Sequence, residues 1–217
     1  MFRLILPETV PDLVAAESDA GDTRPMDADA AAARTRADYG RASRWGMGIL
    51  GTAGGFLALL LASFAVSVAT SGLDPFGDAL FAGFVLLVAA GVGGPAVWLL
   101  VALHRSGRRL ARAAAYWAAL PYRQGRRTPT RGDWFAVRFL GFSSDLFPRL
   151  LTSGLCGLGT VFAVSLFVRT LVDGRPAGEG FLWLSSAVLF ASVCAGQFGG
   201  VQRLQNAFAA RERVRRP

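Results

Sequence analysis

The sequence of 217 residues contains no lysine, one histidine and two cysteines. All 23 basic residues are arginine, which indicates the codon bias of a GC-rich, bacterial genome rather than a chemical requirement. Cys156 and Cys194 both lie in apolar stretches, so we predict reduced, buried thiols and no disulfide framework. With His104 as the single histidine, no pattern of metal ligands can be recognised.

Charge is also absent from four long stretches, 45–73, 79–104, 150–168 and 180–202. Each reaches the roughly 18 residues that a transmembrane helix needs. The hydrophobic content of 53% and a mean hydropathy of +0.40 exclude a soluble enzyme and a secreted disulfide scaffold. A β-barrel is excluded because its strands alternate over about 10 residues. The sequence predicts an all-α, polytopic helical membrane protein with spans at 45–71, 78–104, 150–172 and 181–203.

Arginine is concentrated in three of the segments outside these spans. Residues 105–149 hold ten arginines and two acidic residues, whereas 71–78 holds two acidic residues and no arginine. The tail 1–44 holds four arginines just before the first span, and the tail 204–217 is also basic. Because short cytoplasmic loops retain positive charge, we predict two helical hairpins in the cytoplasmic (inner) membrane, N-in and C-in, joined by a basic cytoplasmic linker.

The N-terminal segment has a different composition. Residues 1–33 carry two arginines against seven acidic residues and are rich in Ala, Asp, Pro and Thr from Ser18 onward. A short apolar patch before Pro7 does not fit the pattern of a secretory signal. Such a segment buries little apolar surface, so we predict disorder to about residue 33.

Small residues recur in the spans at a spacing of four. Gly51 with Gly55, and Gly196 with Gly200, form GxxxG pairs that let helix backbones approach closely in lipid. We predict helix packing at these positions, within one chain or between copies.

Two further residues mark a possible intramembrane polar site. Pro95 predicts a kink, which neighbouring helices could accommodate or which could line a binding cavity. Gln197 requires a hydrogen-bond partner across a helix interface or could face a solute path. The uncharged stretches 45–73, 79–104, 150–168 and 180–202 contain no Asp, Glu or Lys, which argues against a proton-coupled exporter.

The linker begins with an amphipathic pattern. Four arginines fall on one helical face, opposite Leu103, Leu110 and Trp117, and Pro121 and Gly125 end the helix. A second aromatic segment, 133–142, predicts an interfacial helix. The proposed binding residues for anionic phospholipids or an acidic protein surface are Arg105, Arg108, Arg109, Arg112, Trp134 and Arg138. Insertion by the positive-inside rule alone would also account for the arginines.

Three function classes remain open. The first is a non-enzymatic accessory or scaffold subunit of a membrane complex, which binds a membrane protein partner or self-associates. The second is a small-molecule or lipid transporter or channel component, and the third is a lipid-handling membrane enzyme. The sequence indicates no catalytic, cofactor-binding or metal-binding residue. Nucleic acid is disfavoured as a partner because aromatic residues are not interleaved with the arginines.

Overall fold

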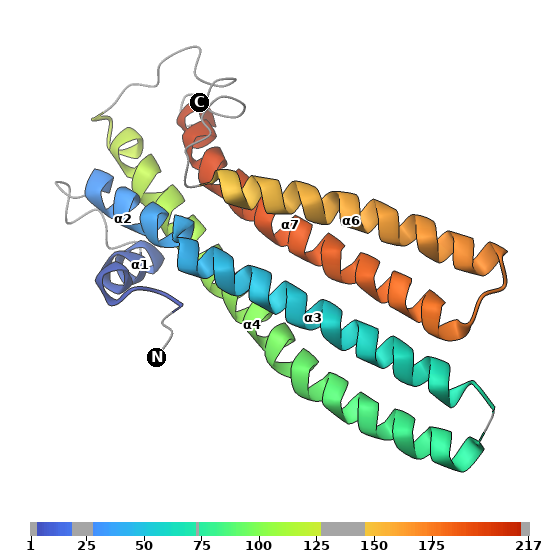
Figure 1. Ribbon diagram of the computed structural model, residues 1–217. Coiled ribbons are helices and arrows are strands. Elements are labelled where there is room, and N and C mark those ends of the chain that lie inside the picture. Colours follow the sequence, from blue (N-terminus) through green and yellow to red (C-terminus); the bar gives the residue numbers. More distant parts are fainter. Residues whose placement is uncertain (1–3, 19–27, 73, 127–145, 214–217) are drawn as a thin grey trace. The chain divides into compact units, whose positions relative to one another are not determined.

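The computed structural model (Figure 1) describes residues 4–18, 28–72, 74–126 and 146–213, with side chains described through residue 203. All secondary structure in these ranges is helical, which confirms the predicted class. The helices are η1 (Pro7–Thr9), α1 (Val10–Glu17), α2 (Ala28–Gly40), α3 (Ala42–Ala69), α4 (Pro75–Arg123), α6 (Phe147–Val172) and α7 (Ala177–Arg213). The last four are long and apolar enough to cross a membrane.

The chain divides into two compact units. Unit 1 comprises Met1–Trp45, Ala102–Leu150 and Gln197–Pro217, and unit 2 comprises Gly46–Val101 and Leu151–Gly196. Unit 2 contains the greater part of the four predicted spans. Unit 1 contains the ends of the long helices together with η1, α1 and α2.

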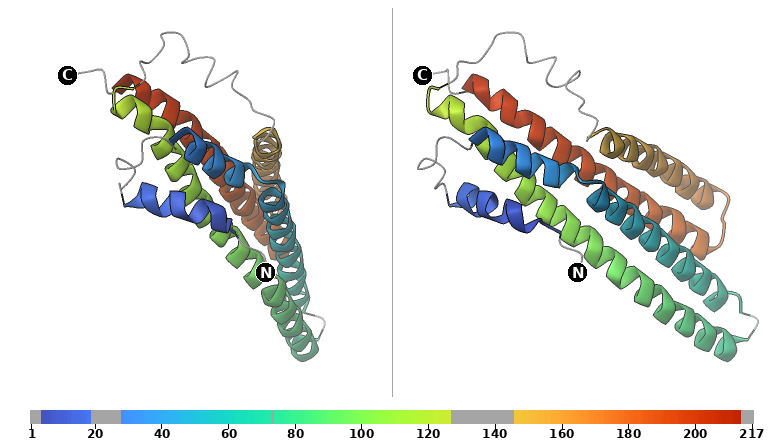
Figure 2. Two further views of the ribbon diagram at one scale, coloured as in Figure 1. Left: turned by 90° about the vertical axis from the view of Figure 1, so that its left-hand side faces the viewer. Right: turned by 60° about the vertical axis from the view of Figure 1, so that its left-hand side comes forward.

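In unit 2, α3 contacts two helices (Figure 2). Small residues allow the approach to α4, since a Cβ added at Gly93 would lie 3.0 Å from the Cβ of Ala58. The second contact of α3 is with α7, where the rings of Phe56 and Phe190 stack with their centroids 5.7 Å apart. The α6 residue Phe162 meets Trp183 of α7 edge to face at 6.2 Å.

Many large apolar side chains of unit 2 remain exposed. Examples from three helices are Phe84, Leu87, Leu158, Val161 and Val188. Helices satisfy their own backbone hydrogen bonds, so an apolar surface of this kind suits a hydrocarbon solvent.

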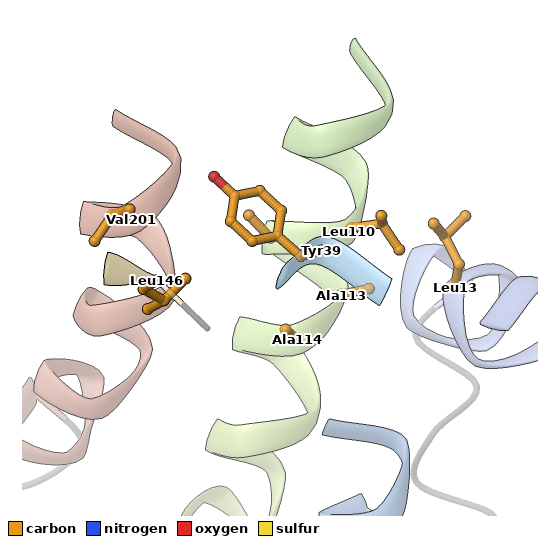
Figure 3. Packing of buried hydrophobic residues seen from close by; sticks show 8 residues of the cluster. Leu13, Tyr39, Leu110, Ala113, Ala114, Leu146 and Val201 are labelled. Carbon is orange, nitrogen blue, oxygen red and sulfur yellow. The ribbon is translucent and has the colours of Figure 1, made fainter. Parts of the chain in front are cut away.

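Unit 1 has an apolar core of its own. Figure 3 shows Leu13 of α1, Tyr39 of α2, Leu110 of α4 and Val201 of α7 in one buried cluster. A second cluster joins residues of α2 and α4, namely Ala28, Ala31, Trp117 and Leu120. The apolar face at the end of α4 is therefore covered by protein.

The N-terminal segment differs from the predicted disorder. Residues 7–17 and 28–40 are helical and packed, and the indole Nε1 of Trp117 donates a 2.9 Å hydrogen bond to the carbonyl of Asp12. Residues 1–33 pack against an apolar surface of α4 that lies about 80 or more residues later in the chain. The composition of residues 1–33 therefore gives no sign of this packing. Disorder rules count only the apolar content of the segment itself.

Two helices extend beyond the predicted spans. The linker helix is continuous with the second span, so α4 runs over 49 residues to Arg123, and Gly125 follows with a φ of 68°. Helix α7 continues to Arg213, past the expected end of the fourth span at residue 203.

Candidate functional site

The arginine face of α4 comprises Arg105, Arg108, Arg109 and Arg112, and all four side chains are exposed. The opposite face is buried, with Leu110 and Ala111 at 0% exposure and Trp117 at 3%. Because unit 1 covers the apolar side of this helix, its orientation is fixed by packing. The arginine face is thus presented outward by a folded unit rather than by an isolated amphipathic helix.

One member of the arginine face is paired within the chain. The Nε and Nη2 atoms of Arg109 each donate a 2.8 Å hydrogen bond to the carboxylate of Glu17 in α1. This bidentate bond lowers the pKa of Glu17, and the positive charge of Arg112 acts in the same direction. In the described part of the chain, the other three arginines form no ion pair.

Two residues predicted to extend this site, Trp134 and Arg138, lie outside the described residues, as does the expected interfacial helix at 133–142.

A second group of charged side chains is buried in unit 1, and sequence reasoning missed it. Arg44 is 3% exposed and donates hydrogen bonds to the Ser106 Oγ at 2.9 Å and to the carbonyls of Leu103 and Leu4. Asp38 is 1% exposed and accepts a 2.9 Å hydrogen bond from the Leu6 amide. The only available signal was that Arg44 directly precedes an apolar stretch, which the positive-inside rule also explains.

Arg149 completes this buried polar cluster, which comprises the buried Asp38, Tyr39 and Arg44 and the half-buried Arg41 and Arg149. The Nη2 of Arg149 donates a 2.6 Å hydrogen bond to the Tyr39 carbonyl, and its guanidinium carbon lies 4.4 Å from the centroid of the Tyr39 ring. The Arg41 Nη1 lies 3.7 Å from the Asp38 Oδ1. Helices α2, α3 and α6 therefore contribute to one charged cluster, and α4 supplies neutral acceptors for Arg44.

Three of the four glycines predicted for helix packing lie against other helices of the same chain. A Cβ at Gly51 would lie 3.0 Å from Leu100 of α4, whereas one at Gly55 would lie 3.5 Å from Leu189 of α7. Gly200 is buried against the hydroxyl of Tyr39, and Gly196 is half-buried. The two residues of the first pair thus serve two different interfaces.

The possible intramembrane polar residues fall in different units. Pro95 belongs to unit 2, where α4 continues through it without interruption. Gln197 belongs to unit 1, and its buried Oε1 has no hydrogen-bond partner among the described residues.

The two cysteines are free thiols of unit 2. The Cys194 Sγ lies 3.5 Å from the Ser153 Oγ, which places it against the part of α6 that carries Cys156. No group of three or more His, Cys, Asp or Glu side chains that could hold a metal occurs in the described ranges. No known protein family, characterised protein or solved structure matches the chain.

Proposed function

We propose that α3, α4, α6 and α7 cross the cytoplasmic membrane as two hairpins, with both termini and unit 1 in the cytoplasm. Charge supports this orientation. Unit 1 holds 21 of the 23 arginines and 11 of the 15 acidic residues, a net charge of +10, whereas unit 2 holds two arginines and four acidic residues, a net charge of −2. The unit richer in arginine belongs on the cytoplasmic side.

In this arrangement the protein serves as a non-enzymatic accessory or scaffold subunit of a membrane complex. The observation that carries this proposal is the exposed arginine face of α4, held in place by the two apolar clusters that contain Leu110 and Trp117. A fixed surface with three arginines that form no ion pair among the described residues suits an acidic surface of a protein partner or an anionic leaflet.

Purification of the full chain in mild detergent, followed by mass spectrometry of bound proteins and lipids, tests the proposal. We expect one membrane protein partner to be recovered, and less of it with the double variant Arg105→Gln/Arg108→Gln. The double variant Arg126→Gln/Arg175→Gln removes the same charge elsewhere and should leave recovery unchanged. Equal recovery with both double variants would contradict a role for the arginine face.

Transport is the second candidate, because the buried Oε1 of Gln197 lacks a partner among the described residues and could face a polar solute. Purified protein alone in liposomes should then move a solute, and Gln197→Leu should abolish the movement. Under the scaffold proposal, Gln197→Leu alters stability or partner recovery modestly and causes no transport defect.

A further inference from the structure

Unit 1 brings basic side chains of two different helices together. In α4, His104 ends the uncharged stretch 79–104, and Arg108 follows one turn later on the same helical face. In α7, Arg203 is the first charged residue after the stretch 180–202. The positive charges of Arg108 and Arg203 both act on His104. Because this effect falls off with distance, the three side chains lie close to one another.

A buried aromatic ring fixes the spacing of α4 and α7 at this level. Tyr39 lies between the two helices (Figure 3), and its Cε2 would be 3.6 Å from a Cβ at Gly107 of α4 and 3.6 Å from a Cβ at Gly200 of α7. Arg108 directly follows Gly107, and Arg203 lies three residues after Gly200. The backbone positions of both arginines are therefore set by packing inside unit 1.

Both arginines are accessible to a ligand. Arg108 is exposed and Arg203 is half-buried. Neither forms an ion pair with another described residue, in contrast to Arg109, whose guanidinium is held by Glu17. A ligand can thus reach both guanidinium groups without displacing a carboxylate of the described residues.

The depth of the two arginines in the membrane indicates the chemistry of this ligand. By the rise of an α-helix, Arg203 lies about 2 Å and Arg108 about 6 Å beyond the end of an uncharged stretch. On the proposed topology both are at the level of the cytoplasmic lipid headgroups. Guanidinium groups present a planar fork of donors that matches phosphate oxygens. Basic sites between membrane-spanning helices on this side of the membrane bind anionic headgroups.

We propose that Arg108 of α4 and Arg203 of α7 together bind the phosphate group of one anionic phospholipid. The site rests on the proposed topology and adds a defined lipid to one end of the arginine face. Because Arg203 is not part of that face, its substitution tests the lipid site and leaves partner recovery unchanged. Loss of the partner with lipid binding intact would contradict only the scaffold role, and the reverse result would contradict only the lipid site.

The test measures thermal unfolding of the delipidated full chain in a non-ionic detergent, where binding does not depend on the orientation in a membrane. Three probes are titrated: dihexanoyl phosphatidylglycerol, dihexanoyl phosphatidylcholine and inorganic phosphate. We expect a saturable rise in Tm with phosphatidylglycerol and little with phosphatidylcholine, whose cationic choline opposes binding to arginine. Inorganic phosphate should require a higher half-saturating concentration than phosphatidylglycerol.

Substitutions separate this site from general surface charge. Arg203→Gln and Arg108→Gln should each weaken binding of phosphatidylglycerol about tenfold, which is the effect of losing one charge-assisted hydrogen bond. The double variant should show no saturable rise in Tm. Arg123→Gln is the matched control, since it removes an exposed arginine from the far end of α4 and should leave the half-saturating concentration unchanged.

Three results would overturn the proposal. The first is an equal rise in Tm with phosphatidylcholine, or none with phosphatidylglycerol. The second is a lower half-saturating concentration for inorganic phosphate, which would make the ligand a free anion. The third is unchanged binding by Arg203→Gln or, if that variant does not fold, by Arg108→Gln; an equal loss in Arg123→Gln would have the same meaning.

Discussion

Gly178, in the first turn of α7, lies so close to α3 that a side chain has no room. A Cβ at this position would be 2.8 Å from the Ser63 carbonyl oxygen and would overlap the Ser67 hydroxyl. The same contact includes a 2.7 Å hydrogen bond from the Ser63 Oγ to the Gly178 carbonyl. This tight contact of α3 and α7 therefore depends on one glycine outside the GxxxG pairs.

We expect Gly178→Ala to destabilise the protein by about 1–3 kcal/mol, because α7 must move away from α3. Thermal unfolding in detergent measures the effect. Gly154→Ala is the matched control, since nothing lies within 4 Å of a Cβ there and alanine is the better helix former. Equal stability of the two variants would show that the contact adjusts without cost.

Glu17 makes the packing of α1 on α4 depend on pH. The hydrogen bonds from Arg109 hold its folded pKa below the ordinary value of 4.5. Its contribution is therefore complete above pH 4.5 and is lost as the pH falls through the lowered folded pKa. Because both side chains are about half exposed, solvent screening keeps this contribution small.

We predict that the fluorescence of Trp117, which packs beside α1 and α2, changes as the pH falls below about 4.5, and that Glu17→Gln reduces this change. A version of the chain with Trp117 as the only tryptophan provides the measurement. Glu8→Gln removes another exposed carboxylate of the N-terminal segment and should preserve the wild-type response. If the fluorescence of the Glu17→Gln variant depends on pH as that of the wild type does, the Glu17–Arg109 pair is not the source of the change.

Helix α4 combines two kinds of surface in one element. Through unit 2 it exposes residues such as Leu87 to the surroundings, whereas in unit 1 Leu110 is completely buried under α1 and α2. We expect Leu110→Ala to cost about 2–5 kcal/mol of the stability of unit 1. Hydrogen exchange should rise in α1 and α2 and stay unchanged in the part of α3 that belongs to unit 2.

Leu87→Ala provides the comparison, since Leu87 is 74% exposed and its removal leaves no cavity. If Leu110→Ala accelerates exchange equally in both units, they do not unfold separately.

The four long helices could be predicted because their signal is local. An uncharged stretch of about 19 residues or more requires no knowledge of its neighbours. The arginine face of α4 was also predictable, from its spacing alone. The helices η1, α1 and α2 were not, because Leu13, Ala28 and Tyr39 pack against residues of α4 about 70 to 100 positions away.

The buried polar cluster was not predictable for a different reason. Arginines at the cytoplasmic ends of spans are expected in any membrane protein of this topology, so their spacing carries no sign of burial. Only the fold shows that Arg44 is buried whereas Arg105 is exposed.

At the scale of the whole molecule, the distribution of arginine makes one direct prediction. A cytoplasm-active reporter fused after Gly125 should give signal, and the same reporter inserted within residues 75–77 should give none. A reporter active only outside the cytoplasm should show the complementary pattern. The reverse result at both positions would place unit 1 on the outer side and contradict the proposed topology.

The position of each arginine along α4 determines how strongly an anionic leaflet attracts it. With a rise of 1.5 Å per residue, Arg105, Arg108 and Arg109 lie at most about 8 Å beyond the uncharged stretch, and Arg123 at most about 28 Å. Physiological salt screens charge over about 8 Å, so on the proposed topology the leaflet attracts the first three arginines and hardly affects the last. At about 0.01 M salt the screening length grows to about 30 Å, and the whole cytoplasmic part of the helix enters the field of the membrane.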